Sequence, residues 1–166
     1  MDAQKQDLRK LHKLIKDIRI GMLTTVEQGG WLHSRPMATV DQDFNGELWF
    51  FTQAHSPKVD EVQRERHVNV SYASQKDNAW ASVAGTAQLV RDQEKIRELW
   101  NPLFKAWFPK GLEDPELALL KVTVERAEYW DTPSGMVVKA VGFAKAVLTG
   151  QQYQPGENHK VELPHH

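Results

Sequence analysis

The stretch from Phe50 to Lys58 constrains the fold of this chain more than any other. Bulky apolar residues occupy both alternating faces of the segment 47–52, which predicts a buried, central strand. Ser56 and Pro57 then mark a helix start. A serine oxygen can accept from an early backbone N–H, and proline at the first helical position gives up a donor that has no helical partner. The stretch therefore predicts a buried strand, a tight connection and a helix.

The same stretch offers a set of groups that suits an anion. Thr52 and Ser56 carry hydroxyl groups, Lys58 carries a positive charge, and the first-turn N–H groups converge on the same space. A phosphate with roughly two negative charges binds to donors of this kind. A capped helix start with a solvated lysine explains the same residues. The motif alone therefore leaves both interpretations open.

Composition narrows the functional classes. The 166 residues predict one domain over residues 1–150, followed by a polar tail over 151–166. The net charge of −1 with mixed signs argues against a nucleic-acid partner, and no apolar run reaches membrane-spanning length. The N-terminus lacks a signal-peptide pattern, so we expect a cytoplasmic protein. The absence of cysteine excludes disulfides, thiol catalysis and zinc–thiolate sites.

Periodicity predicts an α+β fold that is mainly β, with six strands in antiparallel hairpins and a few flanking helices. Short antiparallel strands favour a small barrel over a flat sheet. Gly85 indicates a bulge, and Pro36 indicates an edge, a bulge or a ligand mouth. Strands are expected at 20–26, 31–40, 47–52, 68–73, 79–90 and 120–130, and helices at 2–17 (capped by Asp2), 57–66, after Asp92, from Asp114 and over 137–148, with fraying from Gln151.

The segment from Asp41 to Gly46 matches the first half of a calcium-binding loop. The twelfth position of such a loop should be a bidentate glutamate, and here it is Thr52. The flanking segments are also predicted strands rather than helices. We therefore interpret the segment as a hairpin turn and expect no metal site.

The order of motifs resembles the pyridoxamine-phosphate-oxidase-like flavoproteins, and within them the bacterial general stress protein branch. The resemblance covers residues 5 to 150. It implies an FMN-binding split β-barrel that forms a homodimer, with one flavin at each end of the subunit interface. The motifs are the N-terminal helix, the strand Ser34–Met37, the strand Leu48–Thr52 with Ser56–Lys58 behind it, and the late Glu128–Trp130.

The resemblance implies a flavin site built from two neighbouring strands and the helix start behind them. FMN combines a charged phosphate, which suits that helix start, with a flat apolar ring, which suits aromatic walls. For Arg35 a solvated strand arginine remains the alternative. The residues that the resemblance places against the flavin from one subunit are Arg35, Met37, Phe51, Thr52, Ser56 and Lys58.

Three tryptophans extend this implied site. The resemblance places Trp80 and Trp130 where the partner subunit reaches the flavin, and Trp107 in an aromatic cluster that closes over it. Core packing or dimer contact is the alternative for tryptophans in general. For Trp49 and Trp100 we prefer core packing.

The chain also departs from the pattern of the oxidase enzymes. Pro57 and Val40 stand where the oxidases carry basic residues, so we expect weaker phosphate binding or more reliance on backbone N–H groups. The segment 131–139 lacks the arginine–histidine cluster with which the oxidases hold the vitamin's phosphate. We therefore expect that this protein does not oxidise pyridoxamine phosphate.

The functional expectation is a general-stress-type flavoprotein that binds FMN, or FAD, with any oxidoreductase chemistry supplied by the flavin. No residue stands out as a catalytic base, because His33 and His55 both fit exposed positions. One alternative is a non-catalytic module that binds flavin or works through protein contacts. Another is a haem-handling relative, which would need an axial histidine.

Overall fold

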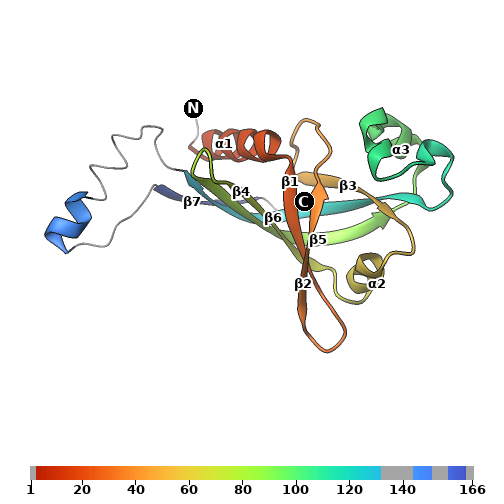
Figure 1. The fold of residues 1–166 in the computed structure, drawn as a ribbon, viewed down its shortest axis with the longest axis horizontal. Coiled ribbons are helices and arrows are strands. Elements are labelled where there is room, and N and C mark those ends of the chain that lie inside the picture. The colour runs from red at the N-terminus through yellow and green to blue at the C-terminus, as the bar shows by residue number, and fades with distance from the viewer. Residues whose placement is uncertain (1–2, 132–143, 151–156, 164–166) are drawn as a thin grey trace.

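The computed structural model describes residues 3–131, 144–150 and 157–163. Its strands form one seven-stranded antiparallel sheet in the order β2-β1-β4-β5-β6-β3, with β7 paired to β6. The sheet curls into a half-barrel flanked by helices (Figure 1). The strands are β1 (Ile20–Val26), β2 (Leu32–Ala38), β3 (Glu47–Gln53), β4 (His67–Ser74), β5 (Ala79–Val90), β6 (Leu117–Asp131) and β7 (Glu157–Glu162). The predicted mainly β, barrel-like fold is confirmed.

Helices close the open parts of this curled sheet. Helix α1 (Ala3–Ile18) covers the sheet with Leu11 and Ile15, which are 0% and 3% exposed and belong to the main core. The cap predicted at Asp2 lies outside the described residues. The other helical segments are α2 (Pro57–Arg64), α3 (Gln93–Leu99), the 3-10 turns η1 (Pro102–Ala106) and η2 (Gly111–Glu113), and residues 144–149.

Strand β3 is buried on both faces, as predicted, but it is not central. It pairs with β6 along its length, and on its other side it meets only the isolated bridge between Phe50 and Thr39 among the described residues. The hairpin predicted over Asp41–Gly46 is reduced to this bridge and a hydrogen bond from the Val40 N–H to the Trp49 carbonyl, because the loop joins strands at opposite ends of the sheet. Leu48 and Phe50 on one face of β3 belong to the main core, whereas Trp49 and Phe51 on the other face belong to a second core around α3.

The bulge predicted at Gly85 is confirmed by a register shift between Ala84 and Gly85 in the pairing of β5 with β6. A Cβ atom at Gly85 would lie 2.0 Å from the carbonyl oxygen of Thr123, so the two backbones approach too closely for a side chain. The bulge sharpens the bend at which the long strands turn into the half-barrel.

Two predictions for the second half of the chain are wrong. No helix begins at Asp114; its carboxylate accepts from the backbone N–H of Glu116 at 3.0 Å, and the chain enters β6 at Leu117. The chain also does not fray throughout from Gln151, because β7 pairs with the second half of β6. β7 is anchored by Val161, which is 2% exposed, and such a short polar strand has little periodicity to detect.

The predicted last helix is described only in part. Residues 144–149 are helical, and Gly150 follows with a positive φ of 66°, as expected for a helix terminator. Residues 137–143 lie outside the described part of the chain. Among the described helices, none is long and apolar enough to cross a membrane.

Candidate functional site

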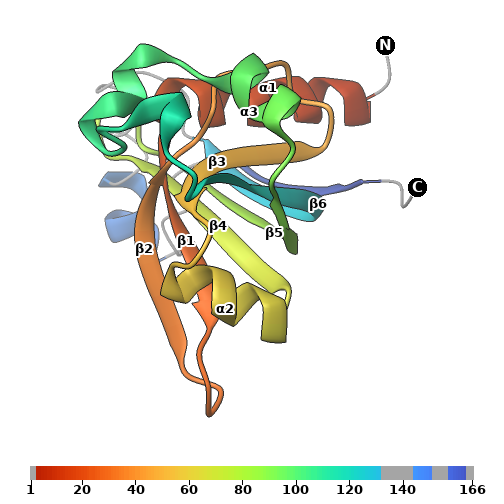
Figure 2. The same cartoon turned by 90° about the vertical axis from the view of Figure 1, so that its right-hand side faces the viewer.

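A pocket of about 380 Å³ lies where β2, the end of β3, the start of α2 and the η1 segment meet. In Figure 2, α2 lies beside the lower part of β2, and the η1–η2 segment lies near the upper end of β2. Six of the nine residues predicted for the site line this pocket. The lining consists of Ile20, Pro36, Met37, Ala38, Phe51, Thr52, Gln53, Ser56, Lys58, Phe104, Trp107 and Phe108.

Hydroxyl groups and one ammonium group form the polar end of the pocket. The Ser56 hydroxyl lies 3.2 Å from the Thr52 hydroxyl, and the Lys58 ammonium donates to Ser56 at 3.3 Å. Ser56 is the N-cap residue of α2, as predicted, but its side chain makes no capping hydrogen bond. The serine oxygen therefore faces the pocket groups rather than the helix backbone.

Lys58 is a half-buried cation without an acidic partner. Among the described residues, no carboxylate oxygen lies within 4.0 Å of its ammonium nitrogen. Burial, and then the nearby charge of Arg35, lower the pKa of Lys58 below its ordinary value. An anion in the pocket would relieve both effects, which makes this end of the pocket suited to negative charge.

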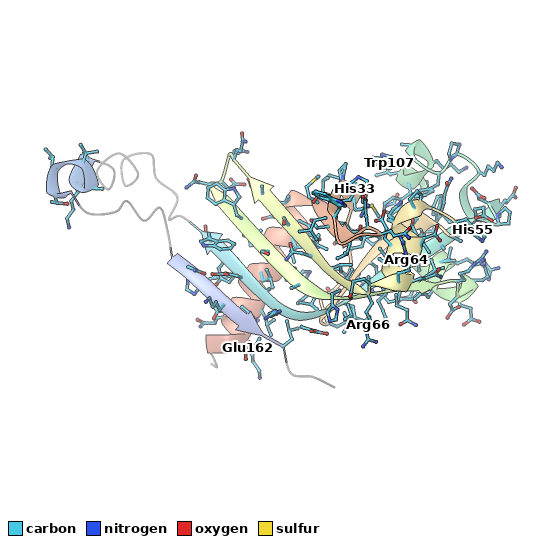
Figure 3. All side chains as sticks on the ribbon, turned by 90° about the horizontal axis from the view of Figure 1, so that it is seen from below. His33, His55, Arg64, Arg66, Trp107 and Glu162 are labelled. Atoms are coloured by element: carbon cyan, nitrogen blue, oxygen red, sulfur yellow. The ribbon has the colours of Figure 1, made fainter. Side chains whose placement is uncertain are left out.

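Aromatic rings form the opposite, apolar part of the pocket. Phe51, which is 5% exposed, packs against Phe104 with ring centroids 4.9 Å apart and edge-on against Trp100 at 5.3 Å. Trp107 follows on the outside, 6.5 Å from Phe104 and 62% exposed (Figure 3). The rings thus pass from the core to an exposed tryptophan at the pocket edge.

Arg35 does not line the pocket. Its guanidinium is largely buried behind it, where it donates to Glu61 at 2.7 Å, to Thr25, and contacts Nδ1 of His33 at 3.0 Å. Glu61 is 5% exposed. Burial alone would raise the pKa of Glu61, but hydrogen bonds from Thr25 and Arg35 outweigh it and lower the pKa. The alternative of a solvated strand arginine is wrong for Arg35, because its side chain is only 16% exposed. The contact between Arg35 and a flavin stays a prediction.

Glu27, His33 and Glu61 form the cluster of possible metal ligands within the described residues, with ligand atoms within 4.8 Å of one another. The Arg35 guanidinium contacts both His33 and Glu61. Its fixed charge already supplies a cation to these donors, so we assign no metal to the cluster.

Trp80 and Trp130 lie away from the pocket. They face each other as cross-strand partners on β5 and β6, and both are partly exposed. The pocket residues of the same chain do not include either tryptophan. Within one chain, the structure therefore does not bring these two tryptophans together with the other predicted site residues.

Sequence reasoning missed three residues of this region. Phe104 and Phe108 line the pocket beside Trp107, but only Trp107 was predicted for the site. Glu61 was assigned no role in the site, although it is buried against Arg35. Its position directly before Val62, on a short helix packed against the sheet, was the available hint.

The chain belongs to the pyridoxamine 5'-phosphate oxidase like family, whose model matches residues 6–154. The protein bli-3 of Neurospora crassa is 32% identical over 156 residues, covering 88% of this chain and 75% of that protein.

Solved structures of general stress proteins share the fold. A Jannaschia sp. CCS1 protein assigned to general stress protein 26 is 27% identical with a TM-score of 0.75, covering 96% of this chain and 99% of that chain. The general stress FMN/FAD binding protein of Xanthomonas citri is 30% identical with a TM-score of 0.69, covering 80% and 93%. The resemblance inferred from the sequence motifs is confirmed by these comparisons.

Proposed function

We propose that the pocket binds a flavin nucleotide, FMN in preference to FAD, with the phosphate at Thr52, Ser56 and Lys58. The observation that carries this proposal is the half-buried ammonium of Lys58, which lacks a carboxylate partner among the described residues. A phosphate would supply the missing charge and accept from both hydroxyls. The FMN/FAD binding relative from Xanthomonas citri supports a flavin as the ligand.

The rest of the pocket fits the flavin ring. Its volume of about 380 Å³ falls within the range of small-molecule sites, and its remaining walls are mostly apolar or aromatic. Met37 and Phe51 would contact the ring from the strands, and Trp107 would cover it from the open side. When bound, the flavin supplies reversible redox chemistry, whereas the protein binds it, orients it and shields it from water.

We further propose that a second copy of the chain completes the site. Ile20 and Met22 are 46% and 41% exposed on β1, and Ile20 also lines the pocket. A partner on this face would cover apolar surface and could bring Trp80 and Trp130 to the flavin. Light scattering coupled to size-exclusion chromatography tests this proposal, and a monomer at all concentrations would overturn it.

A flavin-binding protein without turnover is the second candidate, and one observation favours it. Lys58 is the only ionisable side chain among the described residues that line the pocket. His55 lies outside, where it is exposed and contacts Glu116 at 2.5 Å, and His33 contacts Glu27 at 2.9 Å. Oxidoreductase activity would therefore depend on the flavin and the substrate for proton transfer.

The test is the absorbance spectrum of the purified protein before and after addition of FMN and removal of unbound flavin. Retained flavin bands would support the proposal, and screening of electron donors and acceptors would then separate an oxidoreductase from a non-catalytic flavoprotein. A folded protein that retains no flavin would overturn the proposal and favour a protein-interaction module.

A further inference from the structure

Two cations lie near the start of α2, and their surroundings differ. Arg35 is paired with the buried carboxylate of Glu61 at 2.7 Å, whereas Lys58 has no such partner within the described chain. Glu61 follows Lys58 by three residues on the same helix, so the two side chains are neighbours on the helix surface, although Glu61 turns toward Arg35 and Lys58 toward the pocket. Glu61 therefore acts on the polar end of the pocket without lining it.

We propose that Glu61 is a specificity-determining residue that sets the charge of the phosphate site. Its carboxylate neutralises Arg35, so that the pocket presents Lys58 as its one uncompensated cation among the described residues. This inference rests on the proposed flavin site. Glu61 would thereby weaken the attraction of the site for a phosphate dianion, and leave its affinity for an uncharged ligand unaffected.

The electrostatic coupling supports this assignment. Burial is the main cause that lowers the pKa of Lys58. The charge of Arg35 lowers this pKa further, whereas the charge of Glu61 raises it. The charges of Arg35 and Glu61, which lie 2.7 Å apart, thus act on Lys58 in opposite directions. Because the hydrogen bonds from Thr25 and Arg35 also lower the pKa of Glu61, its charge persists at neutral pH.

The Glu61→Gln variant isolates charge from geometry, because the amide oxygen can still accept from Thr25 and Arg35. At low salt we expect FMN affinity to rise by about tenfold, since one negative charge near the phosphate has been removed. Riboflavin, which lacks the phosphate, should bind as in the wild type. Added salt should reduce the gain for FMN. Fluorescence titration of each flavin measures these affinities.

Two further variants change the local charge in steps, so that the test does not depend on Glu61→Gln alone. Arg35→Gln lowers the local charge by one and should weaken FMN binding, whereas the double variant Arg35→Gln/Glu61→Gln restores the wild-type charge. The double variant should therefore bind FMN within about threefold of the wild type. It also avoids an unpaired buried charge, so it should fold even where Glu61→Gln does not.

The outcomes are distinct. Weaker FMN binding in folded Glu61→Gln, or a double variant as weak as Arg35→Gln, would overturn the inference and assign Arg35 a direct contact with the ligand.

Titration of Lys58 by nuclear magnetic resonance, without any flavin, should show a lower pKa in Glu61→Gln than in the wild type. An unchanged Lys58 pKa would refute the coupling. A wild type that retains no flavin would refute the proposed function while this titration still tests the coupling.

Discussion

Helices α2 and α3 begin in different ways. At α3, the Asp92 carboxylate accepts from the backbone N–H groups of Glu94 at 2.9 Å and Lys95 at 3.4 Å. At α2, the Ser56 side chain makes no capping bond and instead lies beside Thr52 and Lys58. A capped helix start uses its own donors, whereas an uncapped one keeps them for a ligand. The difference leaves the Ser56 hydroxyl beside the polar groups of the pocket instead of bonded to its own helix.

Helix α2 is held in place by its buried face, which points away from the pocket, instead of by an N-terminal cap. Val59 and Val62 are 1% and 3% exposed, and Glu61 between them is bound to Arg35 and Thr25. Packing of an amphipathic face, rather than local preference, supplies most of the stability of a short helix. The pocket side of α2 is thus free to serve binding, and the two sides can be tested separately.

The largest expected effect is a loss of stability when the ion pair on the buried side of α2 is removed. Glu61→Ala leaves the Arg35 guanidinium buried without its counter-ion, and we expect a loss of about 3–5 kcal/mol in the free energy of unfolding. Lys58→Ala on the pocket side should change it by less than about 0.5 kcal/mol. Urea unfolding of both variants measures the difference. Similar values for the two variants would contradict the division between the two sides.

The next effect concerns the pocket side. Lys58→Ala removes a charged hydrogen bond to the phosphate, worth about 1.5–3 kcal/mol, so FMN affinity should fall by roughly 10- to 100-fold. Riboflavin affinity should stay within about twofold of the wild type, because this ligand has no phosphate. Lys95→Ala, which removes the same charge at the start of α3, is the matched control. Equal losses for both flavins would remove the phosphate assignment.

A smaller effect is expected at the aromatic end. Trp107→Ala should weaken FMN and riboflavin equally, by about 0.5–1.5 kcal/mol, because ring packing does not depend on the phosphate. Leu103→Ala, a neighbouring exposed apolar residue at 71% exposure, is the control and should leave both affinities unchanged. A loss confined to FMN would show that Trp107 acts on the phosphate end instead.

The sequence predicted the strands well because their alternation reflects burial on a curled sheet. Gly85 was correctly predicted as a bulge, since a central glycine in a long strand has few other uses. The neighbours of each strand could not be predicted in the same way. Phe50 and its flanking residues are buried on both faces whether the strand is central or, as here, covered at the end of the sheet.

The part of the site that could be predicted consists of residues that lie close together in the sequence. Thr52, Ser56 and Lys58 lie within one short stretch, and they do meet in one pocket. The pairing of Arg35 with Glu61 joins residues 26 positions apart, and no local pattern reports such a contact. The sequence therefore predicted which polar groups meet in the pocket, but not the buried acid that balances the arginine.

The smallest effect compares the two helix starts directly. Asp92→Ala removes an observed cap and should cost about 1 kcal/mol of stability. Ser56→Ala removes no cap and should cost only about a few tenths, whereas its FMN affinity should fall because a pocket hydroxyl is lost. Thermal unfolding and flavin titration of both variants test this contrast. A Ser56→Ala cost equal to that of Asp92→Ala would mean that Ser56 caps α2 in solution, and that the first-turn donors are already used by the helix.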